Sequence, residues 1–152
     1  MTERFAAIAQ QLECCEFTLV LGPAFSEQRK RQLLMQASAQ LSFVTDIFDL
    51  STLMLTHDLV ITLGGISSYE AMCLGIPVAA ITWKYLAPYV LGLDNLGLLH
   101  SLGDIDQAGT RLERLIQGSG EILAARAAKA WQLIDGQGAA RVVAAVLSSR
   151  GV

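Results

Sequence analysis

The chain has 152 residues, of which 53% are hydrophobic and 16% are charged, a composition that suits one domain with a buried core. Its formal net charge of −3 argues against nucleic acid or an anionic membrane surface as a partner, because those partners usually require a basic face. Its three cysteines include no Cys-x-x-Cys pair, so we expect neither a disulfide framework nor a metal site, and a reduced, cytoplasmic protein.

Helical and strand patterns alternate along the first half of the chain. We expect helices at 2–13, 26–40, 50–56 and 67–74, and strands at 16–21, 42–45, 58–63 and 77–82. Alternation of this kind predicts an α/β fold with a parallel sheet. The second half predicts an extended piece at 97–100 and helices at 87–93, 104–117, 119–134 and 138–149. The alanine-rich stretch 124–145 is typical of a tight helix pair, although it could also pack against a neighbouring surface. No segment reads as a signal peptide or a membrane span.

The most informative segment is 58–77, where a strand pattern runs through two glycines into a helix. The apolar run from Leu59 to Leu63 predicts a strand buried on both faces. Gly64 and Gly65 allow a tight turn and a close approach of a ligand to the main chain. The helix that follows presents unpaired N–H groups with a partial positive charge, so this junction is suited to binding an anion such as a phosphate.

Three polar side chains near the start of this helix extend the prediction. Ser67 and Ser68 add hydroxyl groups beside the first-turn amides, and Glu70 follows within one turn, where it could accept hydrogen bonds from a sugar. The same residues also fit a capping box, in which Ser67 caps the helix and Glu70 folds back onto the N–H of the cap. Local spacing leaves both interpretations open.

The segment resembles the carboxyl-terminal domain of GT-B glycosyltransferases of the family 28 type, and especially the UDP-sugar hydrolases of pseudaminic acid biosynthesis. Their signature is a strand, Gly-Gly-x-(Ser/Thr)-(Ser/Thr)-x-Glu, a small helix, Gly-x-Pro and another strand. This chain matches it at Gly64, Gly65, Ser67, Ser68, Glu70, Gly75 and Pro77. Weaker similarities at 19–23, 43–54 and 134–143 extend the resemblance over nearly the whole chain.

The resemblance implies a three-layer, Rossmann-like parallel sheet in which residues 1–152 form a single nucleotide-sugar-binding domain. It also implies a UDP-sugar ligand without a separate cofactor, for a reaction of polysaccharide biosynthesis. By the same resemblance, Ser67 and Ser68 lie near the diphosphate with Gly64, Gly65 and Ile66. Glu70 then binds the ribose hydroxyls, and the Ile47 and Phe48 loop lies beside the uracil.

The chain departs from the family pattern at its first strand. Family members open the sheet with a strand and a glycine-rich loop, whereas this chain begins with the helical pattern 2–13. In the strand order 3-2-1-4-5-6 that missing strand is central. Its absence should either bring strands 16–21 and 58–63 into direct pairing or leave a gap for another chain to fill.

The second departure follows the strand 77–82, where relatives carry polar residues that contact the sugar. This chain has Trp83 to Tyr89 instead, so the sugar stays open. Lys84 should lie at the ligand side of the sheet and could neutralise a phosphate, although a solvated lysine is the simpler interpretation. Asp94 and Asn95 could supply displaced polar contacts, although a turn is the simpler interpretation there too.

No catalytic residue can be assigned from the sequence. We expect the two histidines, His57 and His100, to be structural, and the two-domain relatives place the acceptor and the water-activating base in their other half. Three hypotheses follow: a nucleotide-sugar-binding domain or subunit that needs a partner half, a self-sufficient UDP-sugar hydrolase or 2-epimerase acting as a homodimer, and a non-enzymatic interaction domain.

Overall fold

The computed structural model describes residues 1–118 and 120–149. The strands are β1 (Phe17–Leu21), β2 (Leu41–Thr45), β3 (Val60–Thr62), β4 (Val78–Ala80) and β5 (His100–Ser101). The helices are α1 (Thr2–Ala9), α2 (Glu27–Leu34), α3 (Leu50–Met54), α4 (Ile66–Cys73), η1 (Lys84–Leu86), α5 (Ala87–Asn95), α6 (Ile105–Gln117), α7 (Gly120–Leu133) and α8 (Gly138–Ser149). No helix of these residues is long and apolar enough to cross a membrane.

The strands form two parallel sheets rather than one. β1 pairs with β2, and β3, β4 and β5 pair in that order, but no hydrogen-bonded ladder joins β1 to β3. In the order 3-2-1-4-5-6 the strands of this chain take positions 3-2 and 4-5-6, so position 1 is vacant. The parallel α/β fold is confirmed, and of the two alternatives for the strands β1 and β3, direct pairing does not occur. We call the interruption between β1 and β3 the sheet break.

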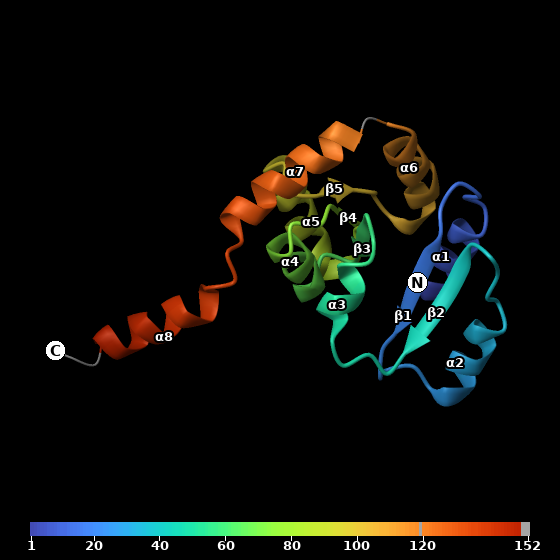
Figure 1. Cartoon of the computed structure of the whole chain (residues 1–152), viewed down its shortest axis with the longest axis horizontal. Coiled ribbons are helices and arrows are strands. Elements are labelled where there is room, and N and C mark those ends of the chain that lie inside the picture. The colour runs from blue at the N-terminus through green and yellow to red at the C-terminus, as the bar shows by residue number, and fades with distance from the viewer. Residues whose placement is uncertain (119, 150–152) are drawn as a thin grey trace.

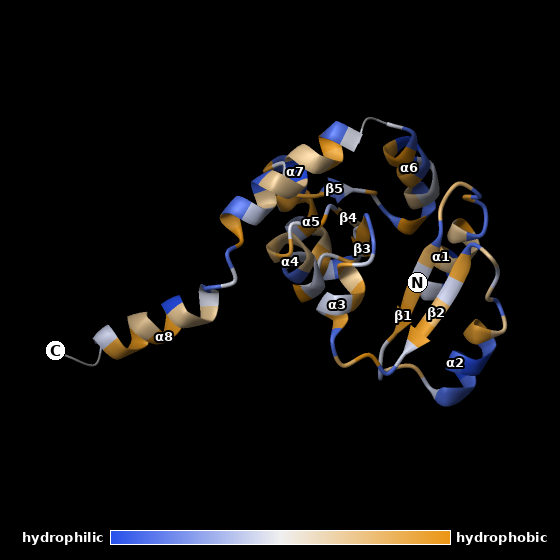
Figure 2. Cartoon of the chain, viewed as in Figure 1, coloured by the Kyte–Doolittle hydropathy of each residue, from blue (hydrophilic) through white to orange (hydrophobic). Residues whose placement is uncertain are grey.

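Helices cover both faces of the strands, which confirms the three-layer arrangement (Figure 1). One hydrophobic cluster lies under α1 and α6 and receives side chains from both sheets. Its buried members are Phe5, Ala6, Ala9, Leu12, Leu19, Leu41, Ala79, Ile81, Leu102, Ile105, Ala108 and Leu112. The second cluster joins β4 to α3, α4, α5 and α7. Figure 2 shows β1 and β2 as predominantly hydrophobic strands. The shared first cluster holds the two sheets together without a ladder, since each fully buried leucine contributes about 1.5–3 kcal/mol.

Local capping determines where several helices begin. The side chains of Ser26, Asp49 and Asp104 each accept a first-turn N–H, as expected for these residue types. α1 and α2 end earlier than predicted, at Ala9 and Leu34. After α2 the residues 35–39 are all exposed, so no apolar contact supports further turns.

The two carboxyl-terminal helices behave differently. α7 buries Ala127 and also Ala130, which belongs to the second cluster, whereas α8 buries no residue and extends away from the rest of the molecule (Figure 1). The expected tight helix pair is therefore wrong, because Gly136, at a φ of 72°, turns the chain between them. The expected helix start at Ser119 lies outside the described residues.

Asp135 holds the start of α8 through a two-pronged ion pair. Its carboxylate accepts hydrogen bonds from Arg141 at 2.7 and 3.0 Å, and these bonds, followed by the Gln137 N–H, lower the pKa of Asp135 from 3.8 to about 2.

We predict that Arg141→Ala raises the pKa of Asp135 toward 3.8, which an NMR titration of the carboxyl carbon will measure. Because the folded pKa lies below the unfolded value, the pair stabilises the α7 to α8 junction above about pH 4 and is lost as the pH falls through about 2. Asp49, whose pKa is lowered by Thr52 instead, is the internal control and should not respond. An unchanged Asp135 titration would rule out the ion pair.

Candidate functional site

The glycine turn after β3 is built by two glycines with different roles. Gly64 has a φ of 84°, and a Cβ placed on it would lie 2.3 Å from Val90 Cγ2 on α5. Both the backbone angle and the close packing therefore require glycine. Gly65 has a φ of −85°, and a Cβ there would meet no atom within 4 Å. The start of α4 consequently faces open space at Gly65.

The predicted capping box does not form. The N-cap of α4 is Gly65 and no side chain caps the helix, so Ser67 is the second helical residue rather than the cap. The helix begins one residue earlier than expected because Gly65 supplies the extended N-cap geometry itself. Glu70 is exposed, and within the described part of the chain its carboxylate has no polar partner.

The two serines point into different environments. Ser68 is fully buried, and its hydroxyl pairs with Thr62 Oγ1 at 2.7 Å. Thr62 Oγ1 also accepts the Gly64 N–H at 3.1 Å, so this pair of hydroxyls braces the turn from inside. Ser67 is only half-buried. The sequence did not lead us to predict this role of Thr62, although a hydroxyl residue near the end of an apolar strand could have indicated it.

Lys84 follows β4 at the same sheet edge at which the glycine turn follows β3, because the two strands pair in parallel. Lys84 has a φ of 45°, unusual for a residue with a side chain, which costs roughly 1–2 kcal/mol. Its ammonium lies 5.1 Å from the centre of the Trp83 ring. Strain of this kind is concentrated at functional sites.

The loop after β2 carries the other two predicted residues. Phe48 is fully exposed and Ile47 is half-buried. They follow the carboxyl end of β2 in the other sheet. The segment from Gly64 to Glu70 and Lys84, by contrast, follow paired strands of one sheet. An exposed aromatic side chain is suited to stacking on a flat ring.

The surroundings of both histidines favour a structural role. His57 Nδ1 lies 2.9 Å from the Leu53 carbonyl oxygen, and Nε2 lies 2.9 Å from Thr18 Oγ1 on β1. His100 Nε2 is buried and has no hydrogen-bond partner among the residues that the structure describes. Burial, followed by the positive charge of Arg126, lowers the pKa of His100 below its usual value of 6.5.

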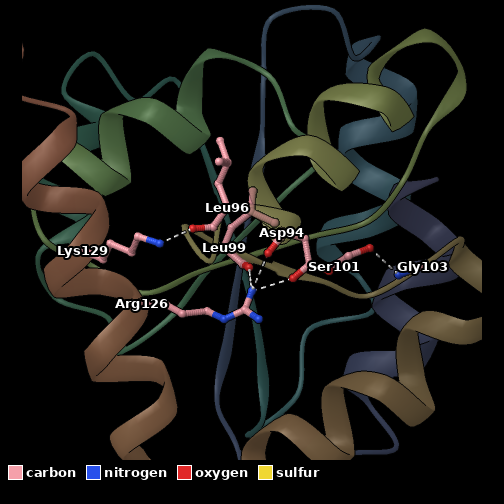
Figure 3. A network of polar contacts seen from close by, with 7 residues as sticks. All are labelled: Asp94, Leu96, Leu99, Ser101, Gly103, Arg126 and Lys129. Carbon is pink, nitrogen blue, oxygen red and sulfur yellow. Dashed lines mark hydrogen bonds and ion pairs between the residues drawn. The ribbon is translucent and has the colours of Figure 1, made fainter.

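A network of polar contacts joins α7 to α5 and β5 (Figure 3). Arg126 donates to the Asp94 carboxylate at 2.5 Å and to the Leu99 carbonyl oxygen, and Lys129 donates to the Leu96 carbonyl oxygen at 2.6 Å. Asp94 lies in the last turn of α5, not in a separate turn as expected. Its carboxylate is engaged by Arg126, which argues against a role in ligand binding.

Two surface hollows lie elsewhere on the molecule. One, of about 550 Å³, lies between α1 and α6, and the other, of about 430 Å³, lies beside β5. Neither is lined by residues of the glycine turn. At the turn itself, the side of Gly65 on which a side chain would stand is free of other atoms within 4 Å.

Comparison with solved structures shows the fold. The spinosyn rhamnosyltransferase SpnG, in a complex with thymidine diphosphate, is 23% identical, with a TM-score of 0.70 over 89% of this chain. A Listeria monocytogenes protein assigned as a UDP-N-acetylglucosamine 2-epimerase is 21% identical, with a TM-score of 0.66 over 98% of this chain. The glycosyltransferase SnogD from Streptomyces nogalater is 24% identical, with a TM-score of 0.59 over 91% of this chain. The chain thus shares the fold of GT-B glycosyltransferases.

This chain matches only part of the length of each of these proteins. This chain spans 36% of the length of the SpnG complex, 40% of the Listeria protein and 39% of SnogD. None of the known family models and none of the curated proteins matches the sequence.

Proposed function

We propose that this chain is the nucleotide-sugar-binding domain or subunit of a glycosyltransferase or sugar-nucleotide hydrolase, and that a partner half supplies the chemistry. The observation that carries the proposal is the glycine turn. A helix of eight residues begins in open space at Gly65, without a side-chain cap, and has an unpartnered carboxylate one turn later at Glu70. This arrangement suits a diphosphate followed by a ribose.

The proposed roles follow from where each group lies. The first-turn amides of α4 and the Ser67 hydroxyl bind phosphate oxygens, while buried Ser68 keeps the turn in shape. Glu70 accepts hydrogen bonds from the ribose hydroxyls, and Lys84 adds positive charge at the neighbouring strand end. The aromatic ring of Phe48 stacks on the base, which we propose is uracil or thymine.

Two features support a partner half. A Cβ at Gly65 would meet no atom within 4 Å, so this chain does not cover the start of α4 there, and a second surface could exclude water from a reacting sugar. The helix α8 also carries a row of exposed apolar side chains, Val142, Val143, Val146 and Leu147, and buries none of them. A surface of this kind is typical of an interaction site.

A second candidate is a self-sufficient UDP-sugar 2-epimerase or hydrolase acting as a homodimer. The likeness to the Listeria protein over 98% of this chain favours it. Conversion or hydrolysis of UDP-N-acetylglucosamine by the purified chain alone would establish this candidate, whereas no turnover alongside measurable binding favours the partner-dependent subunit.

We predict that UDP or dTDP raises the melting temperature of the wild-type chain and that Glu70→Ala weakens nucleotide binding about tenfold or more. A charge-assisted hydrogen bond contributes about 1.5–3 kcal/mol, which corresponds to at least this factor. Calorimetric titration with UDP and dTDP measures both affinities directly.

Glu13→Ala is the matched control, because Glu13 is equally exposed and belongs to the loop between α1 and β1. It should leave the nucleotide affinity unchanged. No melting shift with millimolar UDP or dTDP, or equal weakening by the two glutamate variants, would overturn the proposed site.

A further inference from the structure

The hollow of about 430 Å³ beside β5 is lined by charged side chains of one sign. Arg111 and Arg114 of α6 and Arg126 of α7 contribute to its wall, and none of the described residues that line it is an aspartate or a glutamate. The larger hollow between α1 and α6 differs, because Asp106 and Glu113 are part of its wall. The hollow beside β5 is therefore a local accumulation of positive charge on a chain whose net charge is −3.

Two of these three guanidinium groups are not neutralised by a carboxylate. Arg126 pairs with Asp94 and also donates to the Leu99 carbonyl oxygen. Arg111 and Arg114, by contrast, form no ion pair with any residue that the structure describes. They are three residues apart on α6, so their side chains lie on neighbouring parts of the helix surface. An anion that enters the hollow would meet two uncompensated positive charges.

The guanidinium of Arg111 lies close to the main chain that follows β5. A Cβ built on Gly103 would lie 3.2 Å from Arg111 Cζ. Gly103 has a φ of 70°, and its N–H bonds to Ser101 Oγ at 3.2 Å (Figure 3). The lack of a side chain at position 103 thus leaves room for the guanidinium beside the end of β5.

Aliphatic side chains form another part of the wall. Leu102 is fully buried, Leu115 is half-buried and Ile122 is exposed, and all three line the hollow. No phenylalanine, tyrosine or tryptophan is among the described lining residues, so a flat base would find no such ring to stack on. An alkyl chain, however, would bury apolar area against these side chains. The volume of the hollow falls in the range of roughly 300–1,000 Å³ that is typical of small-molecule sites.

We propose that the hollow beside β5 binds a small amphiphilic anion, which consists of an aliphatic chain with a carboxylate or phosphate head. The head accepts charge-assisted hydrogen bonds from Arg111 and Arg114, and the chain lies on Leu102, Leu115 and Ile122. No residue of the glycine turn lines this hollow, so the inference stands independently of nucleotide binding.

The test titrates octyl phosphate and octanoate separately into the wild-type chain without nucleotide. Calorimetry measures each affinity, and the NMR signals of the two histidine rings report the location. His100 lines the hollow, so its ring signals should shift with the same concentration dependence as the heat. His57, which contacts Leu53 and Thr18, is the internal control and should not respond. The probe that binds more tightly identifies the preferred head group.

Substitutions and shorter probes separate the two parts of the site. Arg114→Gln should weaken binding about tenfold or more, because it removes a charge-assisted hydrogen bond. Arg31→Gln, at an exposed arginine of α2, is the matched control and should leave the affinity unchanged. Ethyl phosphate, which lacks most of the alkyl chain, and octyl glucoside, which lacks the charge, should each bind at least about tenfold more weakly than octyl phosphate.

Four results would each overturn the proposal. The first is the absence of heat and of a His100 shift with both octyl probes at low millimolar concentration. Equal weakening by Arg114→Gln and Arg31→Gln would show a diffuse charge effect, and equal affinity for ethyl and octyl phosphate would show an adventitious ion only. Equal binding of octyl glucoside would show general adsorption of alkyl chains, for which the exposed apolar side chains of α8 would be sufficient.

Discussion

Replacing Gly64 by alanine should destabilise the chain by about 3 kcal/mol, the largest effect expected from any change at the glycine turn. An L-residue held at a φ of 84° costs roughly 1–2 kcal/mol. The new Cβ would also lie 2.3 Å from Val90 Cγ2, and overpacking of this kind typically costs about 1–3 kcal/mol. Urea denaturation measures the change in the free energy of unfolding.

Two variants separate the causes of this effect. Gly65→Ala should cost less than about 1 kcal/mol, because its φ of −85° is ordinary and no atom lies within 4 Å of the new Cβ. The double variant Gly64→Ala/Val90→Ala should be less destabilised than the sum of the single variants, because the clash is removed. Strict additivity would show that Val90 does not limit the turn.

Arg126→Met should destabilise the chain by about 2 kcal/mol, the second-largest expected effect. Arg126 and Asp94 are 29% and 32% exposed, and the arginine also satisfies the Leu99 carbonyl oxygen. Loss of the guanidinium leaves a half-buried carboxylate and a carbonyl without their donor, and such groups cost about 1–3 kcal/mol each when fully buried. Lys129→Ala is the control. Lys129 is exposed and lies one turn after Arg126 on α7, so its replacement should cost under about 0.5 kcal/mol.

The same variant has a spectroscopic signature at His100. Burial and then Arg126 lower the pKa of His100, while Asp94 raises it, so Arg126→Met should move that pKa upward toward 6.5. Because the folded pKa lies below the unfolded value, neutral His100 favours the folded state above about pH 6.5, and this contribution decreases as the pH falls. An NMR titration of the ring that shows no upward shift would contradict the assigned cause.

Local patterns account for the parts of the fold that were predicted well. The helix starts expected near 26, 50 and 104 depend on residues within one turn of each other, because Ser26, Asp49 and Asp104 cap the helices that begin there. The end of α4 before Gly75, which has a φ of 75°, is equally local. The strand, glycine turn and helix at the candidate site are likewise contiguous in the sequence. Capping at Gly65 rather than Ser67 was missed, because a box and a glycine cap share the same spacing.

Tertiary packing accounts for what was missed. The engagement of Asp94 required α7, 32 residues away in the chain. The brace between Thr62 and Ser68 joins residues close in the sequence but required the buried packing of α4. The separation of α8 from α7 also contradicted an alanine-rich pattern that is typical of helix pairs. In these cases the local sequence is compatible with several arrangements of the side chains, and contacts in the tertiary structure determine which one forms.

The amino-acid sequence by itself determined the alternation of strands and helices and the glycine turn that opens α4, because hydrophobic periodicity and backbone freedom act over a few residues. Only the tertiary structure decided between direct pairing of β1 with β3 and a sheet break. That choice depends on α1 and α6, whose side chains join the two sheets in one shared cluster. The members of this cluster come from distant parts of the chain, so no local pattern could have revealed it.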